Sequence, residues 1–402
     1  MASRSSLSWY AALALGVLAS PLLVLAALSA SLRSRPRRPG AAGDAADAAG
    51  ADAPPPDVYL AARWGERAHR EVRPGVILHT VSRGPRTAPI LLCLHGFPEC
   101  WFAWRHWLLA LSRGRRVVAV DLRGFGESCE RQRRGATWAG SRVFGADEVV
   151  EDLLALVGVL RAERRAALGA AGAESGDGGV EIAAHDWGGI IAHLLAPRLE
   201  ARGELAALVV LAAPHPSTFA RNVTLAQSVR SIYLLQFQVP ILPEWYLSRN
   251  GAAAVAAAFL SRSMGVVRRR SAADPLALSS DDVAVFTWAA RRPGALTAML
   301  AYYRQLFAPS FAAAVASGRA AAALVEAKTM MLWGSRDGAL GPELARGHER
   351  RYANLRVRVI ANCSHWVQQD HVREVLVEVA AFLGADLDEA ALLGEADGAA
   401  AM

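Results

Sequence analysis

The chain has 402 residues, of which 53% are hydrophobic and 20% are charged. This composition is too apolar for an intrinsically disordered protein, and the length allows one large domain with attached segments. The formal net charge is +7, but the 44 basic residues include a single lysine, Lys328, and the arginines are scattered among alanines. Neither a zinc-finger pattern nor a ladder of basic and aromatic residues accompanies them, so nucleic acid is not expected as a partner.

The N-terminal segment carries no charged side chain between Arg4 and Arg33, and residues 9–30 are almost entirely apolar. A bilayer-spanning helix needs about 20 such residues, so residues 1–32 are predicted to be a transmembrane anchor. A cleaved signal peptide is the competing interpretation, although its apolar region is usually only about 7 to 15 residues long. Arginines follow the segment at positions 33–38, and the positive-inside rule then places the bulk of the chain in the cytosol. We expect a single-pass protein of the endoplasmic reticulum membrane.

Low-complexity segments divide the rest of the chain. Stretches rich in Ala, Gly, Asp and Pro without apolar periodicity are typical of linkers and surface loops. They predict a flexible tether, a loop insertion at residues 168–179 and a flexible tail. The predicted domains are the anchor (1–32), the tether (33–57), the first part of a core (58–215), a helical cap (216–325), the second part of the core (326–385) and the tail (386–402).

Between the tether and the tail, short β-type runs alternate with longer helical stretches. This order predicts an α/β fold with a mostly parallel sheet and helices on both faces. The β-type runs stop between the fourth and fifth strands, where the chain becomes rich in alanine, so a helical cap is expected there. The predicted strands are residues 90–94, 116–120, 180–184, 207–211, 329–333 and 356–360, and the predicted helices are residues 147–160, 189–199 and 373–383.

A strand, a sharp turn and an apolar helix meet at the sequence HDWGG of residues 185–189. Small residues two places before and after Asp186, at Ala184 and Gly188, match the pattern of a nucleophile elbow. An aspartate nucleophile favours displacement at a saturated carbon, because the resulting alkyl ester can be hydrolysed, whereas attack on an acyl group would give a reactive anhydride. A structural aspartate in a loop is the alternative.

Two downstream residues stand at successive strand ends in the order that follows such a nucleophile. Asp337 ends the sequence GSRD after one predicted strand, and His365 lies in CSHW after the next. Alone, the first could be a turn former and the second a surface histidine. Together they predict that His365 acts as general base and that Asp337 fixes its tautomer.

Hydrolysis of an ester also needs donors for the negative charge that develops on its carbonyl oxygen. The sequence HGFPE of residues 95–99 follows a predicted strand, and the backbone amides of Phe97 and Trp187 are the predicted donors. The sequence DLRGFG of residues 121–126 predicts a glycine-containing turn. A phosphate loop is excluded there because no lysine follows.

Together these motifs resemble those of the α/β-hydrolase epoxide hydrolases over residues 76–383, and the apolar N-terminal segment resembles the anchored epoxide hydrolase 3 and 4 group. The resemblance implies an α/β-hydrolase fold and a cis bond before Pro98. It also implies that Tyr233 and Tyr303 of the cap hydrogen-bond an epoxide oxygen and protonate the leaving alkoxide. Tyr302 is expected to face elsewhere, because adjacent helical residues do not share a face. Residues 131–143, the loop insertion and the alanine-rich cap interior depart from the family pattern.

The leading hypothesis is an enzyme that converts lipophilic epoxides to vicinal diols. Asp186 would form an alkyl ester with the substrate, and water activated by His365 would hydrolyse it. A dehalogenase is the runner-up, since it would use the same aspartate and the Trp187 indole could hold a halide. The third hypothesis is a catalytically silent, membrane-tethered scaffold, against which the complete triad argues.

No metal or organic cofactor is implied by the sequence. The four cysteines have neither the spacing of a metal site nor the density of a disulfide framework, which suits a reducing compartment. Glycosylation sequons begin at Asn222 and Asn362 and would go unused in the cytosol. The oligomeric state is left open. The cysteines are Cys93, Cys100, Cys129 and Cys363.

Overall fold

The computed structural model describes residues 53–137, 141–169, 178–267, 274, 276–308, 311 and 324–393. The predicted anchor at residues 1–32, most of the predicted tether and most of the predicted loop insertion lie outside the described residues. Within the ranges that are described, no helix has both the length and the apolar character needed to cross a bilayer.

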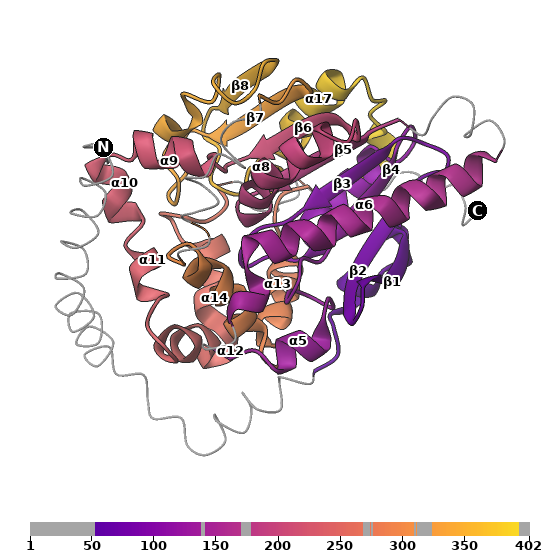
Figure 1. Ribbon diagram of the computed structural model, residues 1–402. Coiled ribbons are helices and arrows are strands. Elements are labelled where there is room, and N and C mark those ends of the chain that lie inside the picture. Colours follow the sequence, from indigo (N-terminus) through magenta and orange to yellow (C-terminus); the bar gives the residue numbers. More distant parts are fainter. Residues whose placement is uncertain are drawn as a thin grey trace.

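The described strands form one sheet in the order β1-β2-β4-β3-β5-β6-β7-β8 (Figure 1). β1 pairs antiparallel with β2, and β2 with β4, whereas all other neighbours are parallel. The predicted mostly parallel sheet is confirmed, and all six predicted strands belong to it. The strands are β1 (Glu66–Arg73), β2 (Val76–Arg83), β3 (Ile90–Leu94), β4 (Arg116–Val120), β5 (Val180–His185), β6 (Leu205–Leu211), β7 (Lys328–Gly334) and β8 (Leu355–Ile360).

The hairpin of β1 and β2 is the part of the sheet that the sequence analysis does not predict. β1 has the sequence ERAHREVR, in which charged residues obscure any alternation, and Arg70 is its one buried residue. The Arg70 guanidinium lies 3.1 Å from the Glu163 carboxylate on α6 (Ala146–Leu168) and also donates to the Thr80 hydroxyl. Polar contacts hold this edge of the sheet, so apolar periodicity gives no signal for it.

Helices flank the sheet in two groups. In one, α6 packs against α8 (Trp187–Glu200), which also contacts β5 and β6 (Figure 1). In the other, α4 (Arg105–Ala110), α17 (Val372–Leu383) and α18 (Glu389–Leu393) pack together. α18 lies within the predicted flexible tail, of which residues 386–393 are described and packed, whereas residues 394–402 lie outside the described residues. Leu392 is buried, and the Asp388 amide donates to the Ala110 carbonyl at 2.8 Å, because apolar side chains in this segment find a surface on α4.

The segment between β6 and β7 forms the helical cap that the sequence predicts. Its described residues contain helices α9 to α14 and no strand. α12 is interrupted at residues 249–252, where the backbone leaves helical values, and α13 begins with a capping box formed by Ser279 and Asp282. The cap helices are α9 (Pro216–Asn222), α10 (Leu225–Arg230), α11 (Tyr233–Gln236), α12 (Leu242–Leu260), α13 (Ser280–Arg291) and α14 (Ala295–Gln305).

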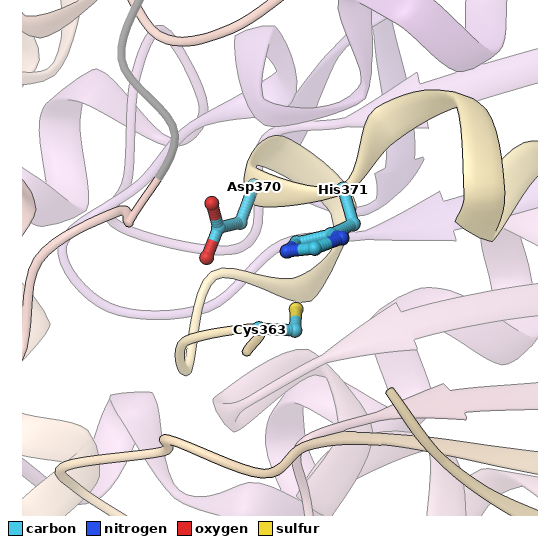
Figure 2. Close-up of side chains that lie close together, drawn as sticks. All are labelled: Cys363, Asp370 and His371. Atoms are coloured by element: carbon cyan, nitrogen blue, oxygen red, sulfur yellow. The ribbon is translucent and has the colours of Figure 1, made fainter. Parts of the chain in front are cut away.

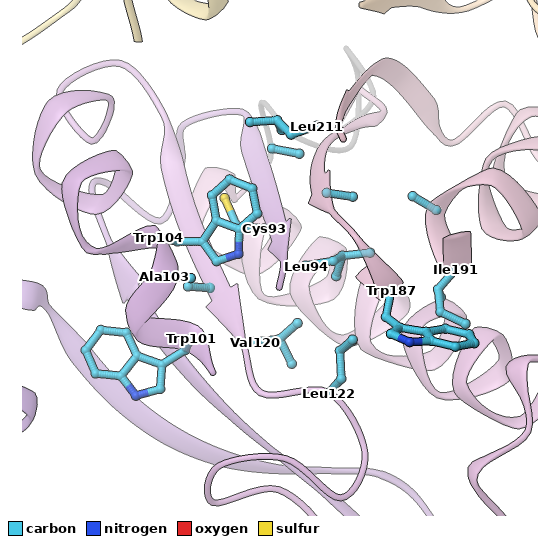
Figure 3. Packing of buried hydrophobic residues seen from close by; sticks show 14 of the residues in the cluster. Cys93, Leu94, Trp101, Ala103, Trp104, Val120, Leu122, Trp187, Ile191 and Leu211 are labelled. Atoms are coloured by element: carbon cyan, nitrogen blue, oxygen red, sulfur yellow. The ribbon is translucent and has the colours of Figure 1, made fainter. Parts of the chain in front are cut away.

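One hydrophobic core joins the sheet, the helices and the cap. Every residue of β3 and β4 is buried, as expected for central parallel strands. Figure 3 shows Trp104 beside Cys93 on β3, and Trp187 beside Ile191 on α8. Burial of such large rings provides much of the free energy of folding, so the strand ends that carry the site residues are firmly supported.

Candidate active site

Asp186 lies in the sharp turn between β5 and α8. Its φ of 49° and ψ of −117° belong to a region that residues other than glycine rarely adopt. The turn tolerates only small neighbours: a Cβ on Gly188 would lie 2.4 Å from the Leu94 carbonyl oxygen. A Cβ on Gly189 would lie 2.4 Å from the Cβ of Ala213. The turn therefore has the strained, closely packed geometry that the nucleophile-elbow pattern predicts.

The structure brings the three predicted triad residues together at the carboxyl ends of β5, β7 and β8. Nδ1 of His365 lies 2.8 Å from Oδ2 of Asp337, and Nε2 of His365 lies 3.7 Å from Oδ2 of Asp186. The Asp337 carboxylate is fixed in turn, because its Oδ1 accepts the amides of Ala339 at 2.8 Å and Leu340 at 2.7 Å. The imidazole thus lies between the fixed carboxylate of Asp337 and the carboxylate of Asp186.

Electrostatics within the triad favour a charged pair at rest. Burial acts to lower the pKa of His365, but the carboxylates of Asp337 and Asp186 raise it to about 10. Burial likewise acts to raise the pKa of the Asp186 carboxyl, but His365 above all, with His185 and the Phe97 amide, holds it below its ordinary value. The lowered pKa favours the ionised form of Asp186 at neutral pH, which is the form that the predicted nucleophile requires.

The loop after β3 supplies a backbone donor to the Asp186 carboxylate. The Phe97 amide donates to Oδ1 of Asp186 at 2.8 Å, and the bond between Phe97 and Pro98 is cis, as the resemblance implies. The backbone at position 96 runs so close to Asp186 that only glycine fits, because a Cβ there would lie 2.5 Å from the Asp186 Cβ. Trp187 is the first residue of α8, so its amide has no acceptor within the helix. Of the two predicted oxyanion donors, the Phe97 amide contacts the Asp186 carboxylate, and the Trp187 amide stands at the start of the helix that follows Asp186.

Both cap tyrosines named by the resemblance face the same cavity as Asp186 and His365. Tyr233 comes from α11 and Tyr303 from α14, and their ring centroids lie 5.9 Å apart at 81°. Tyr302, in contrast, turns away and donates to the Arg123 carbonyl at 2.8 Å. The structure therefore separates Tyr303 from its neighbour in the way that helix geometry predicts.

The environment of these two phenols keeps them protonated. Enclosure in the cavity raises the pKa of Tyr233, and the negative charges of Asp186 and Asp337 raise it further. Burial also raises the pKa of Tyr303, with the Asp186 charge adding to the effect and the Trp187 side chain, through a hydrogen bond, opposing it. Two neutral O–H donors therefore stand opposite an anionic carboxylate.

The cavity between the core and the cap has a volume of about 280 Å³. Polar groups enter it at Asp186, His365 and the two tyrosines, whereas most of the remaining wall is apolar. Such a cavity can exclude water and bind an apolar body while a few polar atoms fix the reactive part. The apolar wall residues include Phe97, Pro98, Phe237, Leu247, Val255 and Met264.

A buried polar network beneath the triad was missed by the sequence analysis. Nδ1 of His185 lies 2.8 Å from Oε2 of Glu99, and Nε2 of His185 donates to the His365 carbonyl at 3.0 Å. The other Glu99 oxygen accepts amide groups from Gln368 at 2.9 Å and Gln369 at 2.6 Å. The sequence held one indication of this network. Glu99 in HGFPE and His185 before Asp186 are polar residues close to the ends of apolar strands.

This network extends to the cap through a buried cation. Nη1 of Arg105 donates to Gln369 at 3.1 Å, and its Nη2 lies 3.1 Å from the Asp282 carboxylate on α13. Burial acts to lower the pKa of Arg105, and the Asp282 charge opposes it. A continuous set of polar contacts thus runs from the cap helix to the loop of His365.

The remaining sequence motif has a structural role. Oδ2 of Asp121, which opens DLRGFG, lies 2.8 Å from Nδ1 of His79, and its Oδ1 accepts the Trp101 amide at 2.8 Å. All four cysteines are buried and form no disulfide. Neither feature enters the cavity.

Comparison with known proteins agrees with this geometry. Residues 89–372 match the family model of the alpha/beta hydrolase fold. The chain is 33% identical to epoxide hydrolase 3 of Xenopus tropicalis over 320 residues, covering 78% of this chain and 76% of that protein. It is 31% identical to epoxide hydrolase 4 of Mus musculus over 302 residues, covering 74% of this chain and 73% of that protein.

A solved structure supports the same fold. The epoxide hydrolase of Bacillus megaterium, in complex with an inhibitor, matches with a TM-score of 0.61 and 24% identity, covering 79% of this chain and 100% of that chain. The resemblance inferred from the motifs is thus confirmed by independent matches over the core and the cap. The chain belongs to the epoxide hydrolase family of the α/β-hydrolase fold.

Proposed function

We propose that this enzyme hydrolyses lipophilic epoxides to vicinal diols through a covalent ester on Asp186. The observation that carries the proposal is the opposition, across one cavity, of an ionised carboxylate and two protonated phenols. Opening an epoxide requires both at once, because the carbon is attacked from one side while the oxygen receives a proton on the other.

In the first step, Oδ2 of Asp186 forms a bond to an epoxide carbon as the bond from that carbon to oxygen breaks. Tyr233 and Tyr303 donate hydrogen bonds to the oxygen, and one of them gives it a proton, so no free alkoxide is released. The product of this step is an alkyl ester that carries a neighbouring hydroxyl group.

In the second step, ester formation removes the negative charge of Asp186, which is one of the causes that raise the pKa of His365. His365 then gives its proton to the tyrosinate left by the first step, which restores the phenol. The neutral imidazole can now take a proton from water, while Asp337 keeps its orientation. Water attacks the ester carbon, and the amides of Phe97 and Trp187 stabilise the oxyanion. As this intermediate collapses, the bond from the carbonyl carbon to Oδ2 breaks and the departing oxygen takes the proton held by His365, which releases the diol. The Asp186 carboxyl then returns its proton to His365, so the carboxylate and the charged imidazole are restored.

The phenols favour this reaction over dehalogenation. A halide leaves without a proton, so it has no use for two O–H donors. The Trp187 side chain, which could hold a halide, is engaged with Tyr303. In this proposal the Trp187 indole orients the Tyr303 phenol and does not bind a halide.

The apolar cavity wall supports lipophilic epoxides as the substrate class. We further propose that residues 1–32 anchor the protein in the endoplasmic reticulum membrane with the catalytic domain in the cytosol, where apolar substrates dissolved in the bilayer are within reach. Treatment of the expressed full chain with a glycosidase should leave its gel mobility unchanged, and a shift would contradict this orientation.

Single-turnover hydrolysis in ¹⁸O-labelled water tests the covalent mechanism. With enzyme in excess over styrene oxide, the first diol should be unlabelled and the label should remain on Asp186, because the transferred oxygen comes from the carboxylate. Label in the first diol would refute the ester. No turnover of any aromatic or aliphatic epoxide would instead favour the silent scaffold.

The tyrosines can be tested with a matched control on the same helix. The variant Tyr303→Phe should lower the rate of ester formation by about 10-fold to 100-fold, and the double variant with Tyr233→Phe should lower it further, since no phenol remains. Tyr302→Phe also removes a hydroxyl from α14, but one that binds the Arg123 carbonyl. Its rate of ester formation should stay near that of the parent, and equal losses in Tyr302→Phe and Tyr303→Phe would contradict the assignment.

A further inference from the structure

Three potential metal ligands converge beside the loop of His365 but outside the cavity. Cys363 follows β8, Asp370 ends α16 (Val367–Asp370), and His371 stands between α16 and α17. Figure 2 shows their side chains close together, and the sulfur, a carboxylate oxygen and a ring nitrogen all lie within 4.8 Å of one another. Cys363 and Asp370 are buried, whereas 12% of the His371 side chain is exposed.

His371 is already oriented as a metal-binding histidine. Its Nδ1 lies 3.3 Å from a carboxylate oxygen of Glu374, and its Nε2 is buried without a hydrogen-bond partner among the residues that the structure describes. Histidines that bind metals commonly use one ring nitrogen for the ion and the other for a carboxylate. A buried ring nitrogen with no partner is also unfavourable by itself, so a ligand at Nε2 would relieve that penalty.

We propose that Cys363, Asp370 and His371 bind one zinc ion, with a water molecule in the fourth position. A thiolate, a carboxylate and an imidazole form a donor set that suits zinc better than magnesium or calcium, which prefer oxygen. In a tetrahedral site these donor atoms would be roughly 3.3 to 3.6 Å apart, so side chains now within 4.8 Å need to close by about 1 Å.

Cys363 would bind the ion as a thiolate, so the thiol proton is released as the bond from sulfur to zinc forms. The partial exposure of His371 provides the route by which the ion enters.

The site would brace the loop that carries the catalytic base. Cys363 precedes His365 by two residues and Asp370 follows it by five, and the Ser364 amide already donates to Oδ2 of Asp370 at 2.8 Å. An ion bound to both residues would add a cross-link between the two ends of this loop. The inference goes beyond the proposed epoxide chemistry, which involves none of these three ligands.

Titration of the full chain with Co²⁺ tests the site, because Co²⁺ replaces zinc and absorbs light. We expect saturation at one ion per chain, a near-ultraviolet charge-transfer band from the thiolate, visible bands typical of four-coordinate cobalt, and loss of all of these on addition of Zn²⁺. Zinc should also raise the melting temperature. This readout needs no epoxide, so it stands or fails separately from the proposed activity.

Matched variants identify the ligands. Cys363→Ser should abolish the charge-transfer band, and His371→Gln, at a partly exposed position, should weaken binding at least tenfold while the circular dichroism spectrum stays native. Cys129→Ser is the control, because Cys129 is also buried but donates to the Ile77 carbonyl far along the chain from this loop. The absence of saturable binding, or a band that persists in Cys363→Ser, would overturn the proposal.

Discussion

The ion pair of Arg105 and Asp282 connects the core to the cap, and the variant Arg105→Met tests its contribution to stability. The two side chains are almost fully buried, and Nη2 of Arg105 lies 3.1 Å from Oδ2 of Asp282. Methionine keeps an apolar stem of similar length but leaves the Asp282 carboxylate buried without its countercharge. Breaking a buried pair in this way costs about 3–5 kcal/mol.

The value should fall in the upper part of that range, because Arg105 also donates to Gln369 at 3.1 Å and to the Phe102 carbonyl at 3.3 Å. With an unfolding entropy of about 2.1 cal/mol/K per residue over roughly 300 folded residues, the whole domain has about 0.6 kcal/mol/K. A loss of about 5 kcal/mol then lowers the melting temperature by about 8 °C. Thermal unfolding followed by circular dichroism at pH 7 measures this shift.

A double-mutant cycle separates the pair from its surroundings. Asp282→Asn removes the charge but keeps an oxygen that can accept the Ser279 amide, so the helix cap is retained. The double variant should be more stable than the sum of the single effects predicts, by at least about 1.5 kcal/mol. Arg86→Met is the control, because Arg86 pairs with Glu66 at 2.8 Å on the surface and should matter little. Additive single effects, or a loss of less than about 1 kcal/mol in Arg105→Met, would refute the reasoning.

Two further predictions concern the nucleophile and the acid limit of stability. Gly96→Ala should lower epoxide turnover about 100-fold, because its Cβ would lie 2.5 Å from the Asp186 Cβ. Gly114→Ala is the control and should keep full activity, because its Cβ would have no neighbouring atom within 4 Å. Equal activities of the two variants would contradict the proposed contact between residue 96 and Asp186. Burial lowers the pKa of His348 to about 4, whereas the pKa of a histidine in an unfolded chain is about 6.5. Between these two pH values the unfolded state binds more protons than the folded state. The free energy of unfolding should therefore fall by up to roughly 3 kcal/mol as the pH drops from about 6.5 to about 4. The side chain of His348→Gln can still accept a hydrogen bond from the His215 amide. Urea unfolding between pH 7 and 4.5 should show a smaller loss of stability in this variant than in the parent. Identical pH profiles would exclude His348 as a cause of the acid sensitivity.

The parts of the fold that could be predicted are those in which a short sequence pattern alone determines the local structure. β3 and β4 are central strands buried on both faces, so they appear in the sequence as short apolar runs. The triad was also accessible, because Asp186, Asp337 and His365 each follow a strand and the parallel sheet brings the carboxyl ends of its strands to one edge.

The parts that escaped prediction depend on partners far apart in the chain. Gln369 donates to Glu99 across 270 positions, and Arg105 meets Asp282 only after the cap has folded over the core. Each of these residues alone is typical of a protein surface, and only the tertiary structure shows the partner that satisfies its hydrogen bonds or its charge in the interior. The cluster of Cys363 and His371 escaped for a related reason, since no motif of metal ligands has its spacing.

The hydrogen bond from the Phe97 amide makes the two oxygens of Asp186 unequal. Oδ1 is held at 2.8 Å by that amide, while Oδ2 faces His365. In the proposed mechanism Oδ2 leaves with each diol and an oxygen from water takes its place, whereas Oδ1 stays through every cycle unless the carboxylate rotates. After many turnovers in labelled water, a peptide containing Asp186 would therefore carry one heavy oxygen. A second heavy oxygen would appear at the rate of rotation, so the isotope pattern of this residue would record how long the amide holds its oxygen.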